Sequence, residues 1–167
     1  ILLSNLIFKE LNYYLSLMVV DSILQDIKYA DLTNIKIQEA KGRFEIVNDS
    51  PIKIIDGAHN YEGVEIILRN YENKYGHLNT DLFVGFKKGK DINNIFNLII
   101  GKTNYNLHLI EDDTFFDQEI TKEIGYLLDK HGKNYKISSL EQFNRNKNPS
   151  ILLGSLYLIG EYKKREL

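Results

Sequence analysis

An acid, a glycine, a histidine and an amide stand within five residues of this chain, in the run Asp56-Gly57-Ala58-His59-Asn60. The run follows an apolar segment, 52–55, and precedes residues at helical spacing, which predicts a loop between a strand and a helix. Its glycine permits a turn that a side chain would obstruct. The histidine and the amide would then face a helix start, where free amides and the helix dipole attract phosphate or carboxylate groups. The alternative is that Asn60 only caps the helix and Asp56 only closes the turn.

Two lysine-containing segments resemble phosphate loops only superficially. A Walker A loop needs four residues between its glycines and a serine or threonine after its lysine. Only three residues separate Gly85 from Gly89, and an aspartate follows Lys90. Gly101-Lys102-Thr103 has the required ending, but Phe96 stands where the first glycine is needed. We interpret the first segment as a solvated loop and the second as the end of a helix.

Composition and spacing exclude several other kinds of site. The chain has no cysteine, so it holds no disulfide, thiolate metal site or cysteine nucleophile. The four histidines lack ligand spacing, which argues against a zinc site. Ser155 lies in Gly-Ser-Leu and not in a Gly-x-Ser-x-Gly elbow, so a hydrolase triad has no support. With 21 basic and 23 acidic residues, the formal charge of −2 gives no indication of a nucleic-acid partner.

The rest of the 167-residue chain predicts the elements that position these residues. Apolar residues at helical spacing predict one long amphipathic helix from about Ser4 to about Ile27. Short apolar runs then alternate with helical stretches. The expected strands are 44–47, 52–55, 81–86, 107–110, 135–138 and 151–153, and the expected helices are 61–74, 92–100, 118–130 and 155–164. This alternation predicts an α/β fold, a mostly parallel open sheet with helices on both faces.

The predicted sheet points to one edge as the place for a ligand. In an open α/β sheet, ligands bind beyond the carboxyl ends of the strands, near the point where strand order reverses. Four segments follow such ends: 56–60, 85–91, 111–113 and 154–155. The acidic segment 111–113 could hold a cation, but we favour a solvated loop there.

Three segments, taken in order, resemble the folylpolyglutamate synthase and dihydrofolate synthase family of the Mur ligase superfamily: Gly42-Arg43-Phe44-Glu45, 56–60 and Gly154-Ser155-Leu156-Tyr157. Segment 85–91 resembles that family's glycine–lysine–aspartate loop. The resemblance covers essentially the whole chain. It implies a Rossmann-like, glutamate-binding carboxyl-terminal ligase domain over 42–167, preceded over 1–41 by a linker and a remnant of the central ATPase domain.

The resemblance also implies an activity and a set of site residues. The family uses ATP to phosphorylate a carboxylate of a folate, or of dihydropteroate in the dihydrofolate synthase reaction, and the amine of glutamate then attacks the acyl phosphate. By this resemblance Arg43 is catalytic and reaches the ATP phosphates, Asp56 accepts hydrogen bonds from the ribose, and Asn12 touches the nucleotide. His59, also catalytic, lies near the acyl phosphate and glutamate as an orienting donor, and Ser155 helps to hold the glutamate. The resemblance implies a cytoplasmic enzyme. The family's larger domain supplies the P-loop and the Mg²⁺ ligands, so no metal ligand is expected here.

Some positions depart from the family pattern. Tyr61 stands where the family usually has a proline, Leu153 stands where a threonine is common, and a proline–arginine segment after the fourth strand is missing near Phe115. These departures concern the glutamate side of the site more than the fold. Two alternatives stay open: a Mur-type ligase acting on a peptidoglycan precursor, and a non-catalytic α/β binding or regulatory module.

Overall fold

The computed structural model describes residues 14–19, 22, 40–87, 91–111 and 118–165. The chain divides into two units, Ile1–Glu39 and Ala40–Leu167. Each unit is described by itself. No described helix is long and apolar enough to cross a membrane.

The helix predicted from Ser4 to Ile27 falls mostly on residues that the structure does not describe. Residues 14–19 and 22 are helical, and the rest of that range lies outside the described residues. Four large apolar side chains of this short helix are exposed: Tyr14, Leu15, Met18 and Val19.

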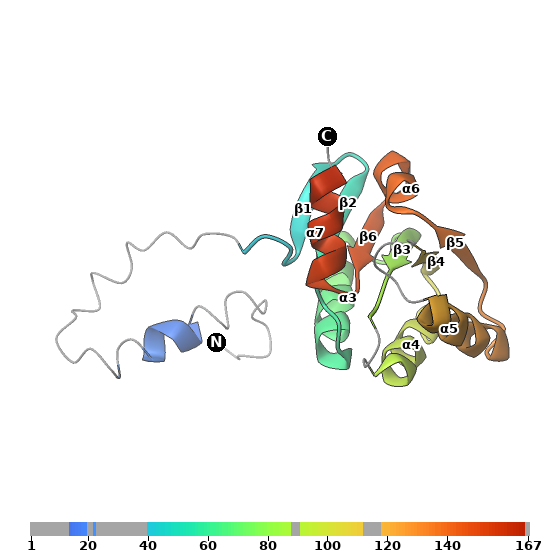
Figure 1. Cartoon of the computed structure of the whole chain (residues 1–167). Coiled ribbons are helices and arrows are strands. Elements are labelled where there is room, and N and C mark those ends of the chain that lie inside the picture. Colours follow the sequence, from blue (N-terminus) through green and yellow to red (C-terminus); the bar gives the residue numbers. More distant parts are fainter. Residues whose placement is uncertain (1–13, 20–21, 23–39, 88–90, 112–117, 166–167) are drawn as a thin grey trace. The chain divides into compact units, whose positions relative to one another are not determined.

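The second unit is built on a six-stranded sheet (Figure 1). Its strands, in the order β1-β2-β6-β3-β4-β5 across the sheet, are β1 (Glu45–Asp49), β2 (Ile52–Asp56), β6 (Ser150–Leu153), β3 (Thr80–Val84), β4 (Tyr105–Ile110) and β5 (Tyr135–Ser138). The neighbouring strands β2, β6, β3, β4 and β5 are all parallel, and of the described strands only β1 is antiparallel to its neighbour. The predicted α/β fold with a mostly parallel sheet is confirmed.

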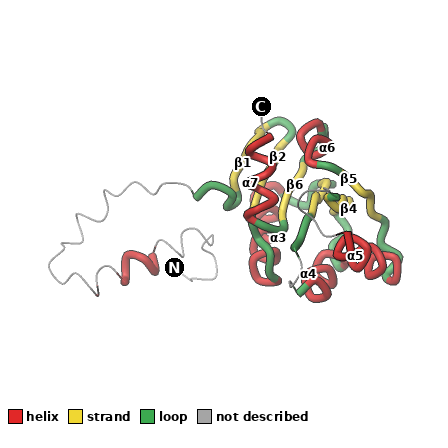
Figure 2. Tube along the Cα trace, in the orientation of Figure 1, coloured by secondary structure: helices red, strands yellow, loops and turns green. Residues whose placement is uncertain are grey.

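Helices cover both faces of the sheet (Figure 2). They are α3 (Tyr61–Tyr75), α4 (Ile92–Ile100), α5 (Gln118–Lys130), α6 (Leu140–Arg145) and α7 (Leu156–Arg165). Alternation along β2 shows the division, since Ile54 packs in the core under α3, α4 and α5, whereas Ile55 packs under α6 and α7. The central strand β6 divides in the same way, with Ile151 and Leu153 on the first face and Leu152 on the second.

Two features of the sheet and its cover were not predicted. Helix α6 begins with a capping box, in which Ser139 accepts from the amide of Gln142 and the Gln142 side chain accepts from the Ser139 amide. The serine and glutamine three residues apart were a usable signal for a helix start. Strand β1 pairs with β2 as a hairpin through Ser50 and Pro51. Because so short a connection joins only antiparallel strands, its length was also a usable signal for antiparallel pairing.

The Gly101-Lys102-Thr103 segment is structural, as interpreted. Gly101 is the C-cap of α4. The Lys102 ammonium contacts both carboxylate oxygens of Glu72 on α3, at 2.9 and 2.7 Å, and Tyr105 donates to the same carboxylate at 3.3 Å. The lysine therefore joins α3 to the α4–β4 connection and is not placed to bind a phosphate.

At the amino end of the sheet, a buried carboxylate organises the loop that leads into β6. Asp81 accepts from the Asn106 amide at 2.8 Å and from the Asn146 and Asn148 amides at 2.9 and 3.0 Å. Burial acts to raise the pKa of Asp81, but the three amide donors and nearby His108 outweigh it, so the pKa lies below its ordinary value. His108 Nε2 lies 3.9 Å from the Asp81 carboxylate.

This cluster predicts that the domain loses stability in mild acid. Burial lowers the pKa of His108 below its ordinary value of 6.5; Lys136 adds to the shift and Asp81 opposes it. A folded-state pKa below the unfolded one means that the contribution of His108 is complete above pH 6.5 and is lost as the pH falls below 6.5. The free energy of unfolding, measured by urea denaturation, should fall between about pH 7 and pH 5.

A matched pair of histidine variants isolates the group. His108→Gln should weaken this pH dependence, whereas His131→Gln should leave it unchanged because His131 is exposed. An identical pH dependence in His108→Gln and the unaltered chain would assign the acid sensitivity to other groups.

Candidate functional site

The carboxyl ends of three neighbouring strands meet at one point of the sheet edge. Leu153, at the end of β6, pairs with Asp56 at the end of β2 and with Val84 at the end of β3. The chain passes from β2 to β3 and leaves between them the place that β6 later fills. This is a change of strand order, the position where open α/β sheets bind ligands. The loops that begin at residues 57, 85 and 154 therefore start side by side.

Glycines allow these loops to touch. Gly154 has a φ of +136°, and a Cβ built on it would lie 2.1 Å from the carbonyl oxygen of Gly85. A Cβ on Gly57 would lie 2.4 Å from Leu156 Cδ2, so the turn after β2 packs directly on the start of α7. The Gly57 amide donates to the carbonyl of Gly42 at 2.8 Å, which adds the segment before β1. All of the glycine-containing family motifs thus converge at one edge.

Asp56 is the buried centre of this arrangement. One carboxylate oxygen accepts from the Ala58 amide at 2.7 Å, and the other accepts from the Phe44 amide at 2.6 Å. Phe44 has a φ of +44°, a left-handed conformation that side chains disfavour. Burial raises the pKa of Asp56, and the two amides and the charge of Arg43 offset part of the rise. Asp56 closes the turn as the alternative supposed, and its contact with a ribose stays a prediction.

Arg43 stands on the turn that Asp56 holds. Its side chain is 48% exposed, and its guanidinium nitrogen lies 4.0 Å from the Asp56 carboxylate. Glu45 and Lys163 support the same turn, because the Glu45 carboxylate accepts from the Gly42 amide at 2.6 Å and from Lys163 at 2.7 Å. Burial acts to raise the pKa of Glu45, but these donors outweigh it and the pKa is lowered. The turn is fixed, while the Arg43 side chain remains about half exposed.

His59 has a defined orientation and tautomer. Its Nδ1 lies 2.8 Å from the carbonyl oxygen of Gly57. Because a carbonyl only accepts, Nδ1 carries the hydrogen, and in the neutral ring Nε2 is an acceptor. The contact of His59 with the acyl phosphate and glutamate stays a prediction. A half-buried ring is left with Nε2 as the atom available to a ligand.

Two other predicted residues cap helices. Asn60 accepts from the Gly63 amide at 3.0 Å and is the N-cap of α3, as the alternative supposed. Ser155 is buried, and its hydroxyl oxygen accepts from the Leu158 amide at 3.1 Å at the start of α7. The Ser155 hydroxyl can still donate one hydrogen bond. Its contact with glutamate stays a prediction.

Several sequence predictions fall on residues that the structure does not describe. Asn12, Lys88 and Lys90 and the acidic residues Asp112 and Asp113 lie outside the described ranges. Among the residues that are described, no group of three His, Asp or Glu side chains could hold a metal ion.

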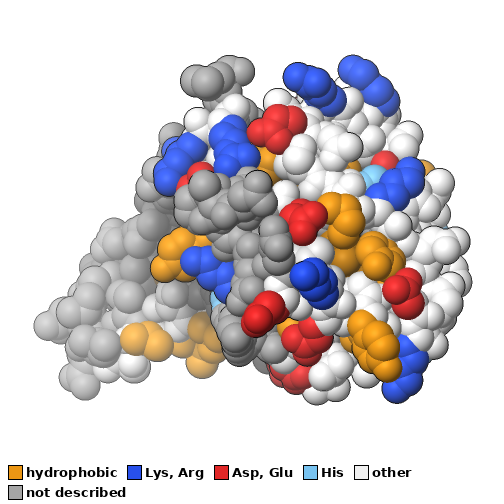
Figure 3. All heavy atoms as spheres, turned by 45° about the vertical axis from the view of Figure 1, so that its right-hand side comes forward, with side chains coloured by type: hydrophobic (Ala, Val, Ile, Leu, Met, Phe, Trp, Pro, Cys, Tyr) orange, Lys and Arg blue, Asp and Glu red, His pale blue; other side chains and the backbone are white. Residues whose placement is uncertain are grey.

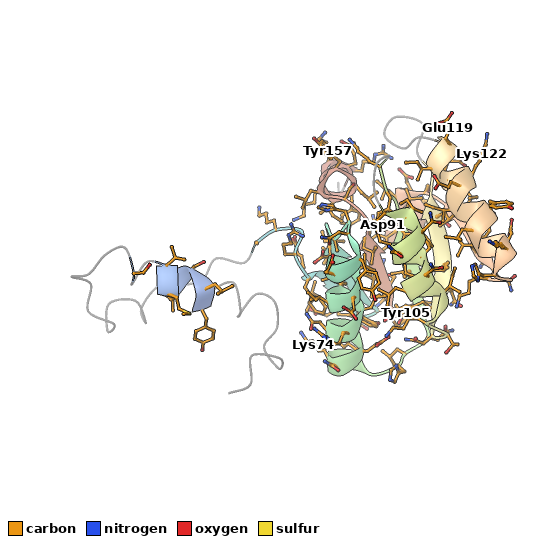
Figure 4. All side chains as sticks on the ribbon, turned by 90° about the horizontal axis from the view of Figure 1, so that it is seen from below. Lys74, Asp91, Tyr105, Glu119, Lys122 and Tyr157 are labelled. Carbon is orange, nitrogen blue, oxygen red and sulfur yellow. The ribbon has the colours of Figure 1, made fainter. Side chains whose placement is uncertain are left out.

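One cation of this edge lies in segment 85–91, for which the sequence predicts a solvated loop. Lys87, in the loop after β3, places its ammonium 3.5 Å from the centroid of the Tyr157 ring on α7. Figure 4 shows Tyr157 toward the same end of the domain as Asp91, which caps α4, and away from Lys74 at the end of α3. The carboxyl edge of the sheet therefore carries three basic side chains, Arg43, His59 and Lys87, which suit an anionic ligand. Elsewhere, basic and acidic side chains are interspersed on the face shown in Figure 3.

Comparison with known proteins gives matches in structure only. No protein-family model matches the sequence, and no curated protein matches it. The folylpolyglutamate synthase of Thermotoga maritima matches 92% of this chain with a TM-score of 0.67 and 20% identity. Escherichia coli FolC in complex with ADP matches 92% with a TM-score of 0.72 and 17% identity. Mycobacterium tuberculosis folylpolyglutamate synthase, complexed with ADP and AMPPCP, matches 90% with a TM-score of 0.70 and 12% identity.

The match covers part of each of these proteins. This chain spans 37% of the Thermotoga chain and 38% of each of the other two. At such low identity the likeness concerns the fold. The chain has the fold of the carboxyl-terminal region of folylpolyglutamate synthases.

Proposed function

We propose that this chain is the carboxyl-terminal part of an ATP-dependent ligase that joins L-glutamate to a folate carboxylate through an acyl phosphate. One observation carries the proposal: an exposed arginine and an oriented histidine lie on adjoining loops at the strand-order change of this fold. Solved proteins with the same fold include complexes with ADP and with AMPPNP and a manganese ion. The enzyme would act in the cytoplasm.

Arg43 would bind the phosphates of ATP. Its guanidinium is nearly half exposed, and a carboxylate 4.0 Å away orients it without using all of its donors. A planar guanidinium matches two phosphate oxygens at once. During phosphoryl transfer, negative charge moves onto the leaving ADP oxygen as the folate carboxylate oxygen bonds to the γ-phosphorus. A fixed cation at the phosphates would stabilise that charge.

His59 and Ser155 would act on the second step. The glutamate amine attacks the acyl carbon, the bond to phosphate breaks, and the amine must lose protons for a neutral amide to form. Nε2 of a neutral His59 can accept a hydrogen bond from that amine, because Nδ1 already donates to Gly57. The Ser155 hydroxyl, fixed by the Leu158 amide, can donate to a glutamate carboxylate. Both groups would position the nucleophile, a large contribution to bimolecular reactions.

Another predicted contact involves the ATPase domain. Asn12 would touch the nucleotide from that domain, and the folate pocket, the P-loop and the Mg²⁺ ligands would lie there too. The described residues fit this division, because the carboxylate nearest the site, Asp56, uses both oxygens on backbone amides. Asp56 would contribute by holding the Arg43 turn as well as by the predicted ribose contact.

Arg43→Ala is expected to lower ligase turnover at least about tenfold, since a hydrogen bond to a charged group contributes about 1.5–3 kcal/mol. The assay is phosphate release by the complete enzyme with ATP, magnesium, tetrahydrofolate and glutamate. Arg43→Lys should restore only part of the rate, because an ammonium cannot bind two oxygens in the same plane.

The control is Arg69→Ala, which removes an exposed arginine from α3. It should keep the unaltered rate, and circular dichroism should show all three variants folded. Unaltered turnover in Arg43→Ala would remove this residue from the site. Offering the enzyme a peptidoglycan precursor in place of the folate tests the Mur-type alternative, which would be supported by turnover with that acceptor alone.

A further inference from the structure

Lys87, in the loop after β3, and Tyr157, in the first turn of α7, form a contact between two segments whose bases are fixed. Lys87 follows Phe86, which is buried and packs edge-on against Phe96 of α4 with ring centroids 5.9 Å apart. Tyr157 lies in the first turn of α7, directly after the segment where Gly154 approaches Gly85. The short distance between the ammonium and the ring therefore joins two rigid supports at the carboxyl edge.

The charge of Lys87 is not neutralised within the described part of the chain. No described carboxylate lies within 4.0 Å of its ammonium, and its described partner is the Tyr157 ring. An aromatic face attracts a cation through its quadrupole but accepts no conventional hydrogen bond. The three N–H donors of the ammonium therefore remain available to an anion. Tyr157 is 64% exposed, so the contact is open to solvent.

We propose that Lys87 and Tyr157 act as an anion-binding clasp, in which Tyr157 positions the Lys87 ammonium to bind a carboxylate or phosphate oxygen of a substrate. The inference rests on the proposed function and adds two residues to its site. Lys87 is the binding residue. Tyr157 acts through it, and the cation–π contact holds the ammonium at the edge without neutralising its charge.

The clasp has a spectroscopic signature that can be measured on this chain. After reductive ¹³C-methylation of lysines, the Lys87 methyl resonance should be shifted upfield by the Tyr157 ring. Tyr157→Phe should keep that shift because the aromatic face remains, and Tyr157→Leu should abolish it. Lys87→Arg assigns the resonance. Tyr126→Leu, which removes a tyrosine that is 75% exposed on α5, should change nothing.

Titration then identifies the anion. Glutamate and inorganic phosphate are added separately, with sodium chloride at equal ionic strength as the reference. A saturable shift of the Lys87 resonance with glutamate assigns the clasp to the amino-acid substrate, and one with phosphate assigns it to the phosphoryl group. Lys122 is the internal control, because Figure 4 places it on α5, apart from Tyr157. A Lys87 response no larger than that of Lys122 for both anions would overturn the proposal.

Kinetics of the complete enzyme separate this inference from the proposed function. Lys87→Gln should raise the KM of the identified substrate about tenfold, and Tyr157→Leu about two- to fivefold, with Tyr157→Phe close to unaltered. Lys122→Gln should leave both KM values unchanged. Unaltered KM values in Lys87→Gln, in an enzyme that does ligate glutamate, refute the clasp and leave the ligase proposal standing. A saturable Lys87 shift in a protein without ligase activity would support the clasp and refute the ligase proposal.

Discussion

Gly154→Ala is expected to destabilise the second unit by more than about 3 kcal/mol, by adding backbone strain to a steric clash. The φ of +136° at Gly154 suits glycine alone, and the new methyl group would lie 2.1 Å from the Gly85 carbonyl oxygen. That oxygen belongs to the backbone of a neighbouring loop, so no side-chain rotation relieves the contact. Either β6 or the loop after β3 must move, and both carry site residues. The free energy of unfolding by urea, followed by circular dichroism because the chain has no tryptophan, measures the effect.

Gly76→Ala is the matched control for this prediction. Gly76 also has a positive φ, +74°, but a Cβ there would meet nothing within 4 Å. Its substitution should therefore show the backbone strain without the clash, a loss of about 1–3 kcal/mol. Equal losses in the two variants would mean that the Gly85 and Gly154 loops separate easily and that their contact does not define the site.

The fold was largely predictable because most of its elements carry local signals. Helix α4 has the predicted bounds of 92–100 and α5 those of 118–130, since apolar residues recur on one face of each and turn residues end them. Strand β3 was predicted to begin one residue late, because its buried Thr80 does not read as strand interior, and it ends at Val84, before the predicted end at residue 86. The burial of the next residue, Asp81, depends on amide donors from Asn106, Asn146 and Asn148, which come from other parts of the chain.

The site was predictable in its location but less so in its contacts. The motifs converge at one edge because parallel strands end there. In open α/β sheets this carboxyl edge is the general position of a ligand site, so the location could be expected from the predicted strands. The partners of Asp56 and Ser155 are backbone amides, and this follows from turn and cap geometry that the motif alone does not specify. Lys87 lies 70 positions from Tyr157 in the sequence, and no local pattern connects them.

The largest functional effect is expected from the chain itself: incubated with ATP, magnesium, tetrahydrofolate and glutamate, these 167 residues should release no phosphate. Phosphoryl transfer needs the γ-phosphate held in line with the attacking carboxylate, mostly by a P-loop and a metal ion. No segment of the sequence has Walker A spacing, and the one with a suitable ending, at Gly101, has its lysine bound to Glu72. Arg43 and Lys87 supply positive charge at one edge but no such cradle.

Adding back the ATPase domain tests whether these side chains complete a divided site. A separately produced amino-terminal domain of the same enzyme, inactive alone, should gain phosphate release when the unaltered chain is added. The Arg43→Ala chain should restore much less, while Arg69→Ala should restore as much as the unaltered chain. Each chain should be folded by circular dichroism before mixing, so that a weak response reports on the site. The prediction would be contradicted if the purified chain alone released phosphate. That release would have to persist after contaminating ATPases are removed and be abolished by Arg43→Ala. It would mean that the carboxyl edge of this sheet holds a complete ATP site.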